Sequence, residues 1–113
     1  MARANLAARL RAALLGFGMA VMAQAPPAAG ETVRVRIENF VFNPATVTVK
    51  AGTVVTFENE DDSPHVVAAT DGSFRSGALD TGGAYSVTFT KPGDFPYFCS
   101  LHPHMQGTII VAP

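Results

Sequence analysis

The feature that most constrains this chain is a series of short runs in which apolar and polar residues alternate. Val33, Val35 and Ile37, for example, alternate with charged residues, and a period of two places the apolar side chains on one face of a strand. Such runs, together with short apolar runs, occupy 33–38, 46–50, 55–58, 66–69, 85–90, 95–99 and 107–111. Glycine and proline signals separate them, and no segment follows a helical period over ten residues or more. We therefore predict an all-β sandwich or barrel of seven to eight short strands.

The segments between these runs are expected to be irregular. Pro44 lacks a backbone donor, so residues 40–44 are interpreted as a kinked connection rather than a central strand. Residues 71–83 are expected to form a loop that opens with an Asp-Gly turn. An acidic segment, 60–64, leads directly to His65.

Residues 1–30 differ in character from the rest of the chain. Three arginines in the first eleven residues precede an apolar stretch of 12 residues, 12–23, and small residues and prolines follow it. This order is typical of a secretory signal peptide. An uncleaved anchor is the less favoured alternative, because a membrane-spanning helix needs about 20 apolar residues. Cleavage after Ala23, Ala25 or Gly30 is compatible with the sequence, and the prediction is export to the periplasm.

The remaining segment, 31–113, is expected to form one domain with a mildly acidic surface. It carries nine acidic and five basic residues, a net charge of −4 with neutral histidines. A negative charge disfavours nucleic acid and anionic membrane surfaces as partners. We expect no membrane insertion after cleavage of the signal peptide, and a monomer.

The single cysteine of the chain, Cys99, is the residue that points to a function. An unpaired thiol is a liability in an exported protein, so it is expected to serve a site. Cys99, His102 and Met105 follow one another at intervals of three residues, and His65 is the one histidine outside this loop. Two imidazoles and a thiolate in a plane, with a weak axial thioether, are diagnostic of a blue copper site. Each residue alone also fits an ordinary structural role, but the four together favour copper.

His104 is a second histidine in the same loop, two residues after His102. One short loop rarely directs two rings at one metal, so we expect His104 to face solvent.

From Phe40 to Val111 the chain resembles plastocyanin-like cupredoxins, which are type 1 blue copper proteins. The resemblance rests on Phe42-x-Pro44, Val49-x-x-Gly52-x-x-Val55, Asn59, Pro64-His65, Phe74-x-Ser76-Gly77, Pro92-Gly93-x-Phe95-x-Tyr97-x-Cys99 and His102-Pro103-x-Met105-x-Gly107. The short spacing between the last three ligand positions is similar to that of amicyanins. The resemblance implies a Greek-key β-sandwich with one type 1 copper ion. It also implies His65, Cys99 and His102 as equatorial ligands and Met105 as the axial ligand.

Two positions depart from the family pattern. Val66 stands where plastocyanins and amicyanins often carry an asparagine that braces the cysteine loop, and Asn59 or Ser100 are the candidate replacements. Ser100-Leu101 also replaces the proline that commonly precedes the second histidine in amicyanins. Because hydrogen bonds around a thiolate tune the metal, the redox potential is not implied by the resemblance.

The expected function is transport of single electrons, with no enzymatic activity. Leu101 and Pro103 flank His102 and predict a small apolar docking patch, with Phe98 as a second outward contact. The acidic residues at 58, 60, 61 and 62 either steer a basic partner or form a solvated turn. By resemblance to amicyanins, a c-type cytochrome and a quinoprotein dehydrogenase are the expected partners.

Two other functions stay open on the sequence. A periplasmic copper carrier or chaperone is the main alternative, although such proteins tend to use several exposed Met and His residues. The other is a cupredoxin that binds another metal or none, since a site of two nitrogens and one sulfur with a weak fourth ligand also fits zinc. Only three histidines and one cysteine are present, too few for a second copper cluster or a dinuclear centre.

Overall fold

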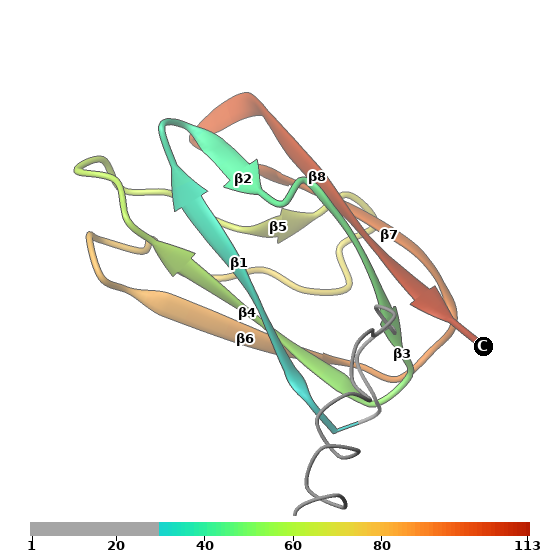
Figure 1. The fold of residues 1–113 in the computed structure, drawn as a ribbon. Helices are drawn as coiled ribbons and strands as arrows, with labels where there is room; N and C mark the ends of the chain where they lie inside the picture. The colour runs from blue at the N-terminus through green and yellow to red at the C-terminus, as the bar shows by residue number, and fades with distance from the viewer. Residues whose placement is uncertain (1–29) are drawn as a thin grey trace, which may run out of the picture.

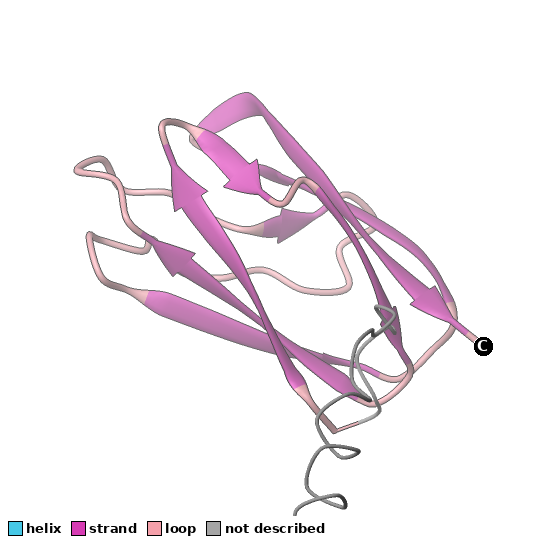
Figure 2. Cartoon of the chain, viewed as in Figure 1, coloured by secondary structure: helices cyan, strands magenta, loops and turns pink. Residues whose placement is uncertain are grey.

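The computed structural model describes residues 30–113, which form two β-sheets packed face to face (Figures 1 and 2). The described residues contain eight strands and no helix, which confirms the prediction of an all-β sandwich. The strands are β1 (Thr32–Glu38), β2 (Val41–Asn43), β3 (Thr46–Lys50), β4 (Thr53–Asn59), β5 (Ala68–Ala69), β6 (Ala84–Phe89), β7 (Gly93–Cys99) and β8 (His102–Ala112).

Both sheets are mixed. The first has the order β2-β1-β4-β6, in which β1 and β4 are parallel and the other neighbours are antiparallel. The second has the order β3-β8-β7-β5, in which β3 and β8 are parallel. Strand alternation determines which side chains face the core: in β4, Val55 and Phe57 are fully buried, whereas Val54 and Thr56 are not.

The core between the sheets is rich in aromatic side chains. Tyr97 from β7 packs edge-on against Phe42 from β2 and Phe57 from β4, with ring centroids 4.7 and 5.1 Å apart. Contacts of this kind contribute about 0.5–1.5 kcal/mol each beyond the burial of apolar area. Because the three rings come from both sheets, they fix the two sheets relative to each other. Tyr97 lies two residues before Cys99, the last residue of β7, so this packing is close to Cys99.

The structure differs from the sequence-based expectation at three strands. The segment 40–44 contains a short edge strand, β2, followed by a cis Asn43–Pro44 peptide. The run 66–69 pairs as a strand only at Ala68–Ala69. The last strand begins at His102 rather than at Gly107, because 102–106 continue the hairpin with β7.

The predicted signal peptide covers residues that lie almost entirely outside the described part of the chain. Within 30–113, no helix has the length and apolarity needed to cross a membrane.

Candidate metal centre

Cys99 is the last residue of β7 and is fully buried in the core. Its Sγ accepts a hydrogen bond from the backbone N–H of Val66, with a donor–acceptor distance of 3.4 Å. This bond comes from the main chain, so it does not depend on the asparagine side chain that Val66 replaces. It holds the thiol against the segment that contains His65.

His65 lies in the connection between β4 and β5, and its ring is fully buried. Its backbone forms an isolated antiparallel bridge with Leu79, in which each N–H donates to the other residue's carbonyl at 3.1 and 2.7 Å. His65 therefore lies outside the named strands and is held by a bridge to the 71–83 loop. The bridge fixes the histidine backbone although no regular strand surrounds it.

His102 begins β8 and pairs with Cys99 across a two-residue turn, Ser100-Leu101. The register changes at this point: Phe98 pairs with Gln106, but the next residue, Cys99, pairs with His102. The residues 103–105 therefore form a bulge in β8.

The bulge places two predicted ligands beside Cys99. His102 pairs with Cys99 directly, and Met105 adjoins the last regular pair, Phe98–Gln106, on the same side as Cys99. The Met105 side chain is 2% exposed and belongs to the same core cluster as Cys99.

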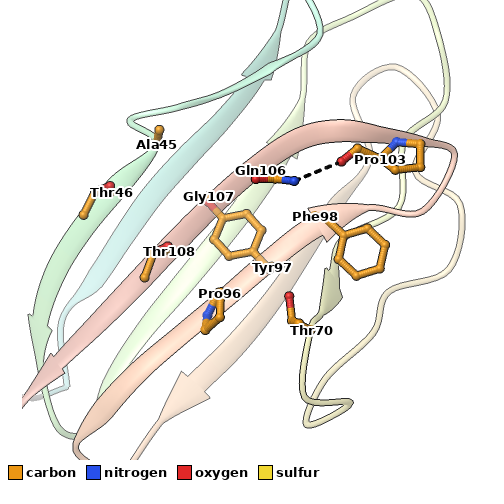
Figure 3. Close-up of a pocket in the computed structure, with 10 residues that line it drawn as sticks. All are labelled: Ala45, Thr46, Thr70, Pro96, Tyr97, Phe98, Pro103, Gln106, Gly107 and Thr108. Carbon is orange, nitrogen blue, oxygen red and sulfur yellow. Dashed lines mark hydrogen bonds between the residues drawn. The ribbon is translucent and has the colours of Figure 1, made fainter.

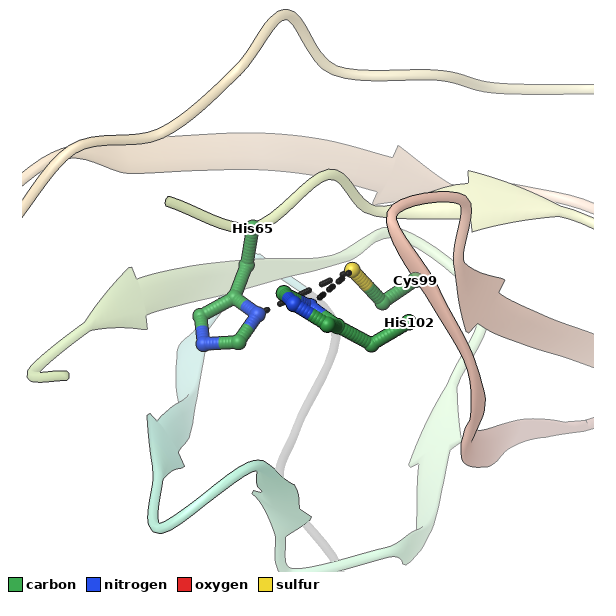
Figure 4. Close-up of side chains that lie close together, drawn as sticks. All are labelled: His65, Cys99 and His102. Carbon is green, nitrogen blue, oxygen red and sulfur yellow. Dashed lines mark hydrogen bonds between the residues drawn. The ribbon is translucent and has the colours of Figure 1, made fainter. Parts of the chain in front are cut away.

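The three atoms that would bind a metal converge (Figure 4). Cys99 Sγ lies 3.7 Å from Nδ1 of His65 and 3.7 Å from Nδ1 of His102. The three ligand atoms all lie within 4.8 Å of one another. Three ligand atoms placed trigonally around an ion at bonds of about 2.0–2.3 Å would lie about 3.5–4.0 Å apart. The donor set and its spacing therefore fit one metal ion.

Asp61 holds the far side of the His65 ring. Its Oδ2 lies 2.9 Å from His65 Nε2, and its two carboxylate oxygens accept the backbone N–H groups of Asn39 and Phe40 at 2.6 and 3.0 Å. Burial raises the pKa of the Asp61 carboxyl, but the bonds from Phe40, His65 and Asn39 together outweigh this and lower the pKa below its ordinary value. A carboxylate at this place keeps the proton of the His65 ring on Nε2, so the Nδ1 lone pair faces Cys99.

Asn59 braces the connection that carries Asp61 and His65. Its side-chain amide donates to the carbonyls of Ser63 and Leu79 at 2.9 and 2.8 Å, and its Oδ1 accepts the Asp61 N–H. Asn59 therefore supports the His65 side of the site rather than the cysteine turn. At that turn, the Arg75 guanidinium donates to Ser100 Oγ at 3.2 Å.

Phe40 lies against both histidine rings. Its ring centroid is 5.2 Å from that of His65 and 5.0 Å from that of His102, with interplanar angles of 82° and 89°. Its backbone has a φ of 59°, and Asn39 before it has a φ of 53°. A residue with a Cβ in this left-handed region costs about 1–2 kcal/mol, so other interactions must hold it there.

The residues that flank His102 are open to solvent. Leu101 is 50% exposed, Pro103 and His104 are also exposed, and His102 is half-buried. His104 does not belong to the convergent group, and its ring centroid lies 6.5 Å from that of His102. The exposure of His104 confirms that it faces solvent.

Most of the acidic run has partners within the domain. Glu58 and Glu60 form surface ion pairs with Arg34 and Arg36, at 3.5 and 3.4 Å, and such exposed pairs contribute little to stability. Asp61 binds the 39–40 turn and His65, as described above. Asp61 is thus the acid of this run that contacts a predicted metal ligand.

A surface pocket of about 480 Å³ lies along β7 and β8 (Figure 3). Phe98 and Pro103 line it, so Phe98 does face outward as predicted. Gln106 donates from its side-chain amide to the Pro103 carbonyl at 3.4 Å across this pocket.

Comparisons with known proteins agree with this geometry. A family model for the cupredoxin-like domain matches residues 11–111. Amicyanin-alpha from Methylorubrum extorquens is 36% identical over 118 residues, which cover 96% of this chain and 93% of the relative. Amicyanin from Paracoccus versutus is 37% identical over 86 residues, and the match covers 72% of this chain and 65% of that relative. A solved Cu(I) form of an amicyanin mutant has a TM-score of 0.66 at 31% identity, covering 81% of this chain and 96% of that one.

The β-sandwich and the thiol between two imidazoles define a protein of the blue copper class. With the family match across most of its length, the chain belongs to the cupredoxin family, and amicyanins and plastocyanins are its homologues. Its cofactor is one type 1 copper ion.

Proposed function

We propose that this cupredoxin is a periplasmic carrier of single electrons, with its copper held by His65, Cys99, His102 and Met105. The observation that carries the proposal is the equal 3.7 Å spacing of Cys99 Sγ from the two histidine Nδ1 atoms. Amicyanins and plastocyanins, to which the chain is related, are single-copper electron carriers.

The ligand residues have distinct tasks in this function. When bound, copper supplies a Cu(II)/Cu(I) couple, for which a thiolate, two imidazoles and a weak thioether are suitable ligands. Cys99 provides the thiolate and His65 a fixed imidazole, and both are fully buried, so solvent does not compete for the metal. Met105 is the axial ligand in this proposal and is also buried.

The chain's own contribution is rigidity. The β7–β8 hairpin fixes Cys99 and His102, the Leu79 bridge fixes the His65 backbone, and Asp61 fixes the His65 ring. Ligands that do not move when the charge of the site changes keep the reorganisation energy low. A low reorganisation energy favours fast electron transfer.

Electrons enter and leave through His102 in this proposal. His102 is the one half-buried ligand, and the exposed side chains of Leu101 and Pro103 flank it. Apolar residues around an exposed metal ligand allow a partner to approach closely, and electron-transfer complexes are typically small and transient. No substrate is transformed by the chain itself.

Location and partners are also part of the proposal. The basic and apolar character of residues 1–30 supports export to the periplasm with removal of the leader. The net charge of −4 over 31–113 supports a basic partner, such as a c-type cytochrome, and by family resemblance a quinoprotein dehydrogenase is the other proposed partner.

An optical titration with Cu(II) tests the proposal. The purified protein is expected to develop an intense blue thiolate-to-copper band that ascorbate bleaches and an oxidant restores, whereas Cys99→Ser shows no band. Weak, colourless binding that a mild chelator reverses would instead favour the copper-carrier function. Tight zinc binding without redox-active copper would favour a non-copper site.

A further inference from the structure

The turn between β1 and β2 contains an unusual residue. β1 ends at Glu38 and β2 begins at Val41, and these two residues pair, so Asn39 and Phe40 form a two-residue hairpin turn. Both have a positive φ, 53° and 59°. Turns with two positive φ angles strongly favour Asn followed by Gly. Asn39 fits this pattern, whereas Phe40 stands where glycine would relieve the backbone.

The position of the Phe40 ring gives a reason for this choice. Phe40 is 41% exposed, yet its ring contacts the rings of both His65 and His102 edge-on, at centroid distances of 5.2 and 5.0 Å. The two imidazole centroids are themselves 5.0 Å apart. The Phe40 ring therefore spans the two histidines on a side of the site that reaches solvent.

One carboxylate connects the turn to the ligand. Asp61 accepts the N–H groups of Asn39 and Phe40 and also contacts His65 Nε2 at 2.9 Å. The Asp61 side chain is 11% exposed, so water competes little with these bonds. The interactions that hold Phe40 in a strained conformation are thus the same ones that orient the His65 ring.

We propose that Phe40 is a positioning residue of the copper site, which restricts rotation of the two imidazoles and shields them from solvent, with Asp61 as the shared anchor. The proposal rests on the proposed function, because His65 and His102 are taken as ligands. It adds a residue from the β1–β2 turn to a site otherwise built from β7, β8 and the 60–65 connection.

The decisive variant is Phe40→Gly, because it removes the ring while glycine suits the positive φ of the turn, so any loss at the site does not come from added backbone strain. Phe40→Tyr keeps an aromatic ring, and Val41→Ala truncates the neighbouring exposed residue as a matched control. The first measurement is the rate at which the copper-loaded protein loses copper to a chelator. The loss of two aromatic contacts is expected to raise this rate at least about fivefold in Phe40→Gly, with Phe40→Tyr and Val41→Ala close to wild type.

A second measurement uses the metal-free protein and does not depend on copper. Diethyl pyrocarbonate modifies accessible imidazoles, and His104, which is exposed, serves as the internal reference. The ratio of His102 to His104 modification is expected to rise at least about fivefold in Phe40→Gly. Thermal unfolding of each variant verifies that the fold is intact, and Phe40→Leu replaces Phe40→Gly if the glycine variant does not fold.

The outcomes separate this proposal from the function on which it rests. If the wild type shows no blue copper band, the proposed function fails, and the labelling ratio still decides whether Phe40 shields His102. If the wild type is blue but copper loss and labelling in Phe40→Gly match Val41→Ala, the role of Phe40 is overturned. An equal increase in Phe40→Gly and Phe40→Tyr would also overturn it, since the tyrosine retains the ring.

Discussion

Asp61 Oδ2 lies 2.9 Å from Nε2 of His65, on the side of the imidazole opposite the nitrogen that faces Cys99. A carboxylate in this position orients the ring and selects the tautomer whose Nδ1 is free to bind a metal. The same carboxylate anchors the 39–40 turn, so its removal affects both the ligand and its aromatic cover.

Substitution Asp61→Asn is expected to weaken copper binding about 10–100-fold, the usual effect of removing a hydrogen-bond partner from a metal-binding histidine. The amide keeps the size of the side chain but offers one acceptor oxygen where three donors converge. Competition with a chelator of known affinity measures the change. Asp62→Asn, a neighbouring exposed acid, is the control, and equal affinities in the two variants would contradict the expected role of Asp61.

Gly107→Ala is expected to destabilise the fold by about 1–3 kcal/mol, as overpacking of a well-packed core does. A Cβ at Gly107 would overlap the hydroxyl and ring of Tyr97, which is itself 1% exposed. Urea denaturation of the metal-free protein measures the loss. Gly77→Ala is the matched control, because a Cβ there meets no atom within 4 Å; a similar effect in both would mean that contact with Tyr97 is not the cause.

Tyr97→Phe is expected to leave stability unchanged or to raise it by about 1 kcal/mol. The Tyr97 hydroxyl is buried without a hydrogen-bond partner among the described residues, and an unpaired buried polar group is unfavourable. Burial also raises the pKa of this phenol above its ordinary value, so the hydroxyl keeps its proton even in mildly alkaline solution. Urea denaturation provides the comparison, and a loss of more than about 1 kcal/mol would show that the hydroxyl forms a stabilising bond.

The carboxyl of Asp71 is expected to titrate below its ordinary pKa. The side-chain and backbone hydrogen bonds of Ser73 lower this pKa, and the Ser73 N–H donates to Asp71 Oδ1 at 2.9 Å. Because the folded-state pKa of Asp71 is depressed, its ionised carboxylate stabilises the folded protein at pH values above the unfolded-state pKa of about 3.9. This stabilisation is lost as the pH falls through the folded-state pKa. NMR titration of the carboxyl carbon measures the value. Ser73→Ala is expected to raise the pKa toward the ordinary value, and no change in it would contradict this cause.

The sequence alone was enough to predict the sandwich and the residues that converge. The period of two placed Val55, Phe57 and Tyr97 in the core, because alternation requires only local geometry. The spacing of Cys99, His102 and Met105 predicted a site because one short hairpin turn keeps nearby residues together. Their role as copper ligands stays a prediction until metal binding is measured.

The parts that could not be predicted depend on contacts between distant segments. Phe40 and Asp61 lie far apart in the sequence, and only the pairing of β1 with β4 brings the 39–40 turn beside the 60–65 connection. An acidic run gives no local signal of which carboxylate will be buried. The start of β8 at His102 was missed for a related reason, since a bulge breaks the alternation on which strand prediction depends.

The bulge at 103–105 also separates the packing of the scaffold from the residues that form the candidate metal centre. From the Phe98–Gln106 pair to the Gly93–Val111 pair, β7 and β8 keep a regular register. The pairing of these residues therefore does not depend on the length or sequence of the turn and bulge that follow Phe98. Insertions, deletions and substitutions between Cys99 and Met105 can therefore alter metal preference or partner choice without a new fold. Natural variation and laboratory evolution can therefore replace this short segment while the β-sandwich stays the same.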